Sequence, residues 1–273
     1  HDHMRDGVRM HAVGRERRIV QTALERSCKK YDLQLKQLKD TEKREKYRIY
    51  GELLNTYGYE LKGGEKSFKC INYYDNEEIT IPLDPQLTAR ENAQKHFDKY
   101  NKLKRTYEAL SQLTMETKAE VDHLESVSSA LDIALEENDL VQIKEELMEF
   151  GYVKKRRANE KRPKITSKPF HYISSDGYDI FVGKNNYQNE ELTFKVASGN
   201  DWWFHAKGIP GSHAIVKSNG QADLPDRVFE EAGALAAYYS KGRENDKVEI
   251  DYIQKKNIKK VAGAAPGFVI YHT

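Results

Sequence analysis

The chain has 273 residues, which is enough for one large domain or two smaller ones. No apolar run approaches the length of a membrane span, and the two cysteines, Cys28 and Cys70, match neither a metal-site spacing nor a disulfide framework. These features argue against a membrane protein and a disulfide-rich secreted protein. Together with the absence of a signal-peptide pattern, they favour a reducing, cytoplasmic compartment.

The charge is unevenly distributed, although the formal net charge is only +2. Residues 13–50 hold twelve Lys and Arg against six Asp and Glu, and residues 154–168 hold eight against Glu160 alone. Basic stripes on a near-neutral chain suit contact with a phosphate backbone, but exposed helices also carry such charges merely for solvation. The candidate ribosome or phosphate contacts are Arg15, Arg17, Arg18, Lys154, Lys155, Arg156 and Arg157.

The first half of the chain predicts a helical arm. Residues 1–12 begin with His-Asp-His-Met, are interpreted as a tag remnant and are expected to be disordered. Residues 13–57 contain no proline and predict a long helix. Residues 66–83 place β-branched and aromatic residues on both sides of a polar turn, which predicts a β-hairpin.

A second long helix is expected at residues 87–135, because apolar residues recur there at steps of three and four over five heptads, from Tyr100 to Leu135. The hairpin would return this helix alongside the first. Residues 13–135 therefore predict a long antiparallel two-helix coiled coil with a small β-hairpin tip. A parallel coiled coil between two chains would satisfy the same heptads.

The second half predicts a compact α+β domain, so the whole chain is α+β. Residues 136–168 are expected to form a short helix and a basic linker. In residues 169–273 we expect a hairpin with a Ser-Asp-Gly turn, a short helix from Asn186, two strands around Gly208–Gly211, an alanine-rich helix and two more strands.

The run from Asp201 to His213 holds both tryptophans and two of the nine histidines. Trp and His need polar partners when buried, so the run suits a stacking and hydrogen-bonding surface. Strand alternation places Trp203 and His205 on one face, and we expect that face to be open to a ligand. The same residue types occur in serine-hydrolase triads and metal sites, but neither a nucleophile-elbow motif nor a zinc spacing is present.

Contact with nucleic acid fits this run best, since aromatic rings stack on bases and a glycine turn admits a phosphate. The amides that follow Gly183 could read base edges or could simply cap the next helix. The lysines from Lys255 to Lys260 form another basic patch or a solvated face. The candidate RNA-binding residues are Lys184, Asn185, Asn186, Asn189, Asp201, Trp203, His205, Lys207, Ser212 and His213.

Several ordered motifs resemble a known family. Residues 168–273 look like the C-terminal RNA-binding module of the NFACT (RqcH) proteins, some of which were formerly named fibronectin-binding protein A, and residues 15–150 look like the central coiled coil of that family. The matching motifs are Asp176-Gly177, Val182–Asn189, Asp201–His205, Gly211–His213, Ala232–Ser240, Val261–Gly263 and Pro266–Val269, with Leu83–Pro85 and Glu91–Phe97 in the arm.

The resemblance implies a factor of ribosome quality control, without catalysis, cofactor or metal of its own. Such proteins bind obstructed large ribosomal subunits and recruit alanyl-tRNA for untemplated tailing of the nascent chain. The expected partners are the large ribosomal subunit, ribosomal RNA and tRNA, with no membrane. The family's N-terminal module lies outside the matched motifs, which leaves tRNA selection by this chain open. The alternatives are a fibronectin-binding adhesin and a metal-dependent RNA hydrolase that uses Asp201, His205 and His213.

Overall fold

The computed structural model describes residues 2–272, with side chains described from Val13 onward. It is an α+β structure in which long helices precede antiparallel sheets, as the sequence predicts. The chain forms two compact units, residues 28–119 and residues 1–27 with 120–273. None of the described helices is long and apolar enough to cross a membrane.

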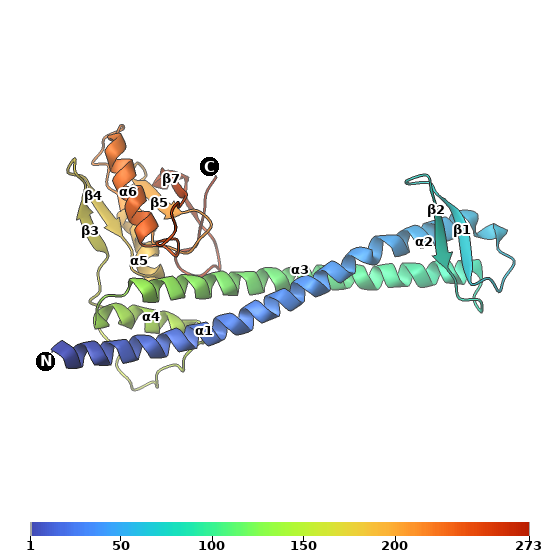
Figure 1. The fold of residues 1–273 in the computed structure, drawn as a ribbon, viewed down its shortest axis with the longest axis horizontal. Helices are drawn as coiled ribbons and strands as arrows, with labels where there is room; N and C mark the ends of the chain where they lie inside the picture. The colour runs from blue at the N-terminus through green and yellow to red at the C-terminus, as the bar shows by residue number, and fades with distance from the viewer. Residues whose placement is uncertain (1, 273) are drawn as a thin grey trace. The chain divides into compact units, whose positions relative to one another are not determined.

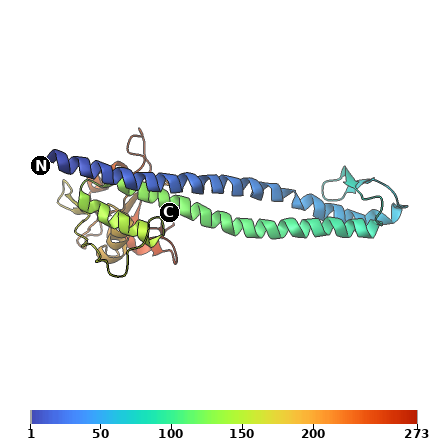
Figure 2. The same cartoon turned by 90° about the horizontal axis from the view of Figure 1, so that it is seen from below.

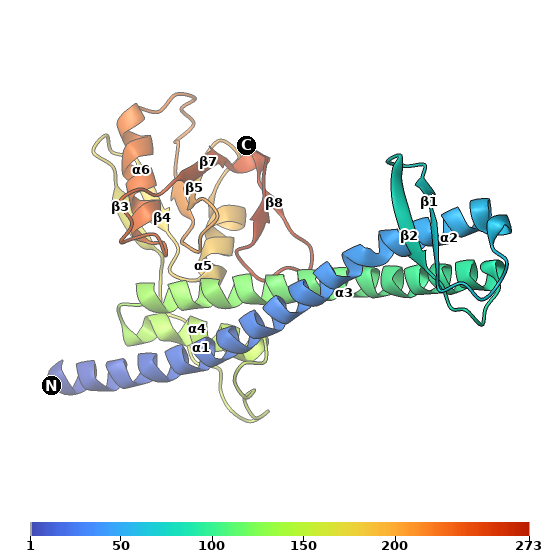
Figure 3. The same cartoon turned by 45° about the vertical axis from the view of Figure 1, so that its right-hand side comes forward.

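The unit of residues 28–119 combines helices with a β-hairpin. It contains the end of α1 (Asp2–Asp40), the 3₁₀ turn η1 (Thr41–Lys43), α2 (Arg44–Tyr57), η2 (Gly58–Glu60) and the first part of α3 (Ala89–Ile133). Strands β1 (Ser67–Asn72) and β2 (Glu77–Pro82) pair antiparallel beside α2 (Figure 3). Phe68 and Ile81 pack on Leu53, Leu54 and Ala93, so the hairpin buries one face on the helices instead of standing alone in water.

The other unit begins with a helical layer. The start of α1, the end of α3 and α4 (Glu137–Glu149) lie side by side (Figures 1 and 2) and enclose a core that includes Val20, Leu131 and Leu147. Arg17 pairs with Asp132 at 2.6 Å, and Ser27 donates to Glu120 at 2.7 Å. From the first pair to the second, the residue number rises along α1 and falls along α3. The two helices therefore run antiparallel here.

The sheet of this unit has five antiparallel strands in the order β3-β4-β6-β5-β7. The strands are β3 (Phe170–Ile173), β4 (Asp179–Val182), β5 (Trp202–Ala206), β6 (Ala214–Val216) and β7 (Ile250–Gln254). Helix α6 (Asp226–Tyr238) covers one face, where its alanines allow close packing on Phe204 and Val216 (Figure 1).

The opposite face of the sheet is also covered. Helix α5 (Asn186–Glu191) continues into the π-turn η3 (Leu192–Val196), and Leu192 packs on Trp203 and Ile215. The 3₁₀ turn η4 (Lys255–Asn257) leads to the small sheet of β8 (Lys259–Lys260) and β9 (Val269–Ile270), from which Val269 and Tyr271 join the same core. Both faces of the sheet are therefore occupied by the chain itself.

The boundaries of the long helices differ from those expected. Helix α1 begins at Asp2, so residues 2–12, expected to be disordered, are helical, although their side chains lie outside the described part. The first helix is interrupted at Thr41, whose buried hydroxyl donates to the Leu38 carbonyl at 2.6 Å. Helix α3 ends at Ile133, which leaves Leu135 outside the helix and 54% exposed.

Candidate nucleic-acid interface

Strand β5 carries the aromatic run, and its side chains alternate as predicted. Trp203 and His205 lie on one face with their rings stacked 5.5 Å apart, whereas Trp202 and Phe204 both contact Phe229 of α6 on the other. Trp203 is only 1% exposed, however, and its ring lies 4.8 Å from that of Tyr271. The expectation that the Trp203 face is open to a ligand is wrong, because residues distant in sequence cover it.

The two histidines beside Trp203 are held neutral by their surroundings. His213 is buried, and its Nδ1 shares a hydrogen bond of 2.7 Å with the Thr193 hydroxyl. Burial lowers the pKa of His205 to about 4 and that of His213 to about 3. Neither imidazole therefore brings a positive charge to a phosphate at neutral pH.

This burial predicts a pH dependence of stability. Unfolded histidines titrate near pH 6.5, so between about pH 6.5 and 4 the unfolded chain binds more protons, and the free energy of unfolding falls as the pH falls. Lowering the pH from 6.5 to 5 should therefore reduce the free energy of unfolding by roughly 1.5 kcal/mol for each of His205 and His213. Urea unfolding at the two pH values measures this, and His213→Gln should remove about half of the contribution of the pair.

Thr193→Val is the matched control, because it removes the hydrogen-bond partner of His213 but not the titrating group. It should lower stability at both pH values by similar amounts. If His213→Gln kept the full pH dependence of the parent chain, the assignment of this dependence to the buried imidazoles would be wrong.

The remaining candidates of the run are not gathered into one site. Asp201 is buried, and its carboxylate accepts hydrogen bonds from the amides of Ser198 and Ser218 and from the Lys217 ammonium. Ser212 is buried and its hydroxyl has no hydrogen-bond partner among the described residues, while Lys207 is exposed.

The hydrolase alternative loses its geometric support. A triad needs hydrogen bonds from the nucleophile to the base and from the base to a carboxylate. Neither Ser212 nor Asp201 is hydrogen-bonded to a histidine whose side chain the structure describes. The described part of the chain also holds no group of three or more His, Cys, Asp or Glu residues suited to a metal.

The amides that follow Gly183 serve the fold of the domain. The side chain of Asn185 caps α5 by accepting from the Gln188 amide at 3.0 Å, and the Lys184 amide donates to the side chain of Gln188. Asn189 Oδ1 accepts from the amide of His213, and a Cβ at Gly183 would lie 2.0 Å from that oxygen. The capping interpretation therefore accounts for these residues, and a side chain at position 183 would displace Asn189.

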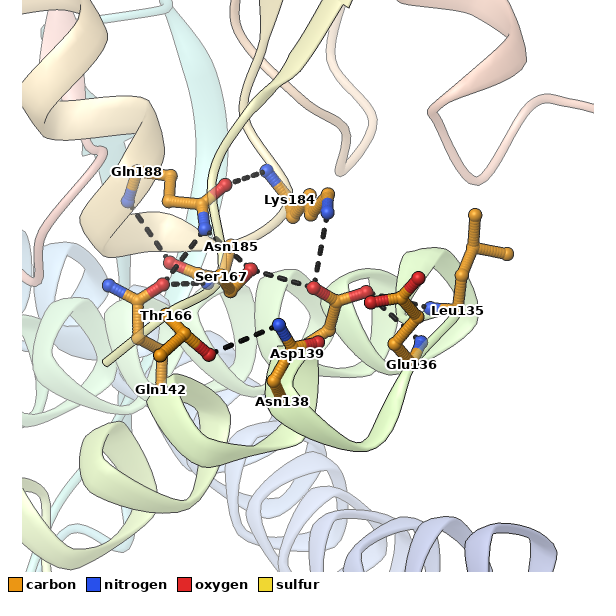
Figure 4. Close-up of polar contacts among 10 residues, drawn as sticks. All are labelled: Leu135, Glu136, Asn138, Asp139, Gln142, Thr166, Ser167, Lys184, Asn185 and Gln188. Atoms are coloured by element: carbon orange, nitrogen blue, oxygen red, sulfur yellow. Dashed lines mark hydrogen bonds and ion pairs between the residues drawn. The ribbon is translucent and has the colours of Figure 1, made fainter. Parts of the chain in front are cut away.

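The same segment is joined to α4 by a buried polar network (Figure 4). Asp139 accepts from the Lys184 ammonium at 3.1 Å and from the Ser167 hydroxyl at 2.7 Å. Gln142 accepts from the side-chain amides of Asn185 and Gln188, each at 2.9 Å. The motif thus holds the sheet domain against α4.

Asp139 also organises the start of α4. Its side chain accepts from the backbone amides of Leu135 and Glu136, each at 3.1 Å, and forms a capping box with Glu136. Burial would raise the pKa of Asp139, but the hydrogen bonds from Ser167, Glu136 and Lys184 outweigh burial and lower it. The carboxylate is consequently charged at neutral pH.

A second part of the network reaches α3. Asn186 donates to the Ser126 hydroxyl and to Glu146, each at 2.8 Å, and Glu146 also bonds His123 at 2.7 Å. Asn186, Glu146 and His123 are all buried. Residues 184–186, predicted as RNA contacts, thus have side-chain partners inside the protein. The sequence gives no sign that Asp139, Gln142 and Glu146 belong to this network, because they look like any other polar residues of an acidic helix.

The exposed candidates are the basic residues. Residues 154–168 contain no helix or strand, and the charges from Lys154 to Lys168 are exposed except Arg156, which is partly buried and paired with Glu145. Arg17 is exposed but pairs with Asp132, whereas Arg15 and Arg18 are exposed without an ion pair in the described part of the chain. Most of the predicted basic contacts are therefore available to a polyanion, whereas the Arg156 guanidinium is already paired with Glu145.

Comparisons with known proteins agree with this architecture. Residues 3–166 match the family model described as NFACT N-terminal and middle domains, and residues 168–272 match the one described as NFACT protein RNA binding domain. The fold and the matched domain define a protein with an RNA-binding module at residues 168–272. The chain belongs to the NFACT family.

Curated relatives are named Rqc2 homolog RqcH. That of Streptococcus suis (strain 05ZYH33) is 46% identical over 254 residues, 92% of this chain and 45% of the relative. That of Bacillus subtilis (strain 168) is 38% identical over 271 residues, 98% of this chain and 47% of the relative. The chain thus spans about half the length of the curated relatives it matches.

A solved structure shares the fold. It is described as the C-terminal of the fibronectin/fibrinogen-binding protein from Streptococcus suis, with a TM-score of 0.76 and 38% identity. The match covers 97% of this chain and 92% of the solved one.

Proposed function

We propose that this chain is the RNA- and ribosome-binding part of a ribosome-associated quality-control factor that acts in the cytoplasm. The observation that carries the proposal is the match of residues 168–272 to an RNA-binding domain in a chain 38–46% identical to RqcH proteins. The exposed basic segment of residues 154–168 directly precedes that domain and supplies charge for a phosphate backbone.

The finer proposal concerns the partners. The chain contacts obstructed large ribosomal subunits through ribosomal RNA, and the whole factor recruits alanyl-tRNA for untemplated tailing without using a catalytic group of this chain. The antiparallel helices α1 and α3 act as a coiled-coil arm, with the β1–β2 hairpin as its tip. In support, Thr117, Val121 and Leu124 of the heptad seam are buried within a single chain.

Co-sedimentation of the purified chain with large ribosomal subunits tests the proposal. We expect the chain to pellet with the subunits at roughly 50 mM salt and to be released progressively toward 200 mM, because neutralising phosphates releases counterions. Failure to pellet at low salt would contradict it.

Binding to fibronectin is the second candidate, favoured by the description of the solved relative. The same preparation, passed over immobilised fibronectin, separates the two functions. Retention on fibronectin together with failure to pellet with ribosomes would favour the adhesin.

A further inference from the structure

An open cavity of about 370 Å³ lies at one end of the five-stranded sheet, where the loop before β5 meets the loop after β6. The end of β7 reaches the same place, since the Lys255 amide donates to the Asp201 carbonyl and the Lys256 amide to the Gly199 carbonyl. The lining residues are Ser198, Gly199, Asn200, Asp201, Lys217, Ser218, Asn219 and Gly220.

The two loops present backbone donors that the protein does not use. Within residues 2–272, the amides of Gly199, Asn200, Asn219 and Gly220 donate no hydrogen bond. Asn219 and Gly220 have successive positive φ angles of 54° and 77°. Consecutive amides in a turn of this kind form a concavity suited to an anion.

Asp201 does not bring an unbalanced negative charge to the cavity. Its carboxylate accepts from Lys217 Nζ at 2.6 Å, from the Ser198 amide at 2.7 Å and from the Ser218 amide at 2.8 Å. Burial would raise the pKa of Asp201, but these bonds outweigh burial and lower it. The ion pair with Lys217 balances the charge, and the two amide bonds tie together the loops that form the walls.

Two exposed lysines lie near the loops that form the cavity, although neither lines it. Lys256 is exposed, and its Cβ lies 3.5 Å from the position that a Cβ on Gly199 would take. Lys195 is exposed and directly precedes Val196, whose carbonyl accepts from Lys217 at 2.9 Å. Neither lysine forms an ion pair within residues 2–272.

We propose that this cavity is a phosphate-binding subsite for the backbone of a single-stranded RNA, and the inference rests on the proposed RNA-binding function. Unused amides and free lysines are the donors that phosphates take from proteins. RNA is favoured over free phosphate because Tyr252 of β7 is 56% exposed, and its ring centroid lies 6.0 Å from that of Trp202, the residue after Asp201. One face of this ring stacks on Phe204 with the ring centroids 5.8 Å apart. The exposed side offers a base a stacking surface two residues from the end of β7 that reaches the cavity.

Two measurements test the subsite on the full chain. In the first, inorganic phosphate is titrated into the ¹⁵N-labelled protein, and the amide resonances of Gly199 and Gly220 should shift to saturation while that of Gly233 in α6 stays unchanged. In the second, a labelled single-stranded RNA is bound by Gly199→Asp and by Lys256→Gln. Each variant should bind about fivefold more weakly at 0.1 M salt. The slope of log affinity against log salt should be smaller in magnitude by roughly 0.7, the value for one lost phosphate contact on a single strand.

Gly233→Asp is the matched control, because it adds the same charge at a helical glycine with nothing within 4 Å. It should bind RNA like the parent chain. If Gly199→Asp does not fold, Lys256→Gln, which changes only an exposed side chain, decides the second measurement.

The possible outcomes separate the subsite from the function. If the parent chain binds RNA but the variants bind equally well with an unchanged salt slope, the subsite is wrong and the function stands. If phosphate shifts the amide resonances to saturation but the chain does not bind RNA, the cavity is an anion site and the RNA function is contradicted. The absence of saturable shifts would overturn the subsite.

Discussion

Replacing Asp139 by alanine is expected to lower the free energy of unfolding by about 3 kcal/mol, because it breaks a buried ion pair and a helix cap at once. Asp139 is 1% exposed, and its carboxylate bonds the Lys184 ammonium, the Ser167 hydroxyl and two backbone amides at the start of α4. Without it, these donors remain in a region with little access to water. Urea unfolding at pH 7 measures the loss.

Glu137→Ala is the matched control, since Glu137 is an exposed acid of the same first helical turn. It should cost only a few tenths of a kcal/mol, the size of a surface charge acting on a helix dipole. Hydrogen exchange should rise in residues 184–188 of Asp139→Ala and stay unchanged in the control. Equal stabilities of the two variants would show that the network does not hold the domain.

Neutralising the exposed basic segment is expected to have the largest effect on binding. The variant Lys154→Gln, Lys155→Gln and Arg157→Gln should lower the slope of log affinity against log salt by roughly 2–2.7, or 0.7–0.9 for each lost phosphate contact. These side chains are exposed and form no ion pair within residues 2–272, so stability should change little. Co-sedimentation with large ribosomal subunits over a salt series gives the slope.

The control removes three exposed charges elsewhere in the same unit: Arg227→Gln, Arg243→Gln and Lys247→Gln. It leaves the segment of residues 154–168 intact and changes the net charge equally. If both triple variants lose the same affinity, binding follows net charge and the segment has no special role. If neither loses affinity, RNA contact lies elsewhere on the chain.

The elements with a strong local pattern could be predicted from the sequence. The hairpin around Asp75-Asn76 and the strand at Trp202 lie within a residue or two of their predicted places, because β-branched and aromatic alternation and turn residues are local signals. The start of α1 and the interruption at Thr41 were missed. At the interruption the Thr41 hydroxyl bonds the Leu38 carbonyl, a contact that no periodicity reveals.

The candidate site was predicted less well, since residue type indicates chemistry but not exposure. Alternation on β5 correctly placed Trp203 with His205, yet it could not show that η3 and Tyr271 cover that face. The amides of residues 185–189 have the donors needed to read bases, but capping and contacts with α4 use them. The residues that cover Trp203, and those of α4 and His213 that bond the amides, lie far from them in the sequence.

The amino-acid sequence is enough to predict the α+β class, the order of helices and strands, the family and the basic segment, because each follows from local periodicity, motif order or composition. Which polar groups remain available depends on the tertiary structure. It buried Trp203, His213 and Asn186 against residues far along the chain, and it left unused amides where the loops at Gly199 and Gly220 meet. Burial and hydrogen-bond pairing are set by contacts between distant segments, which no local pattern encodes.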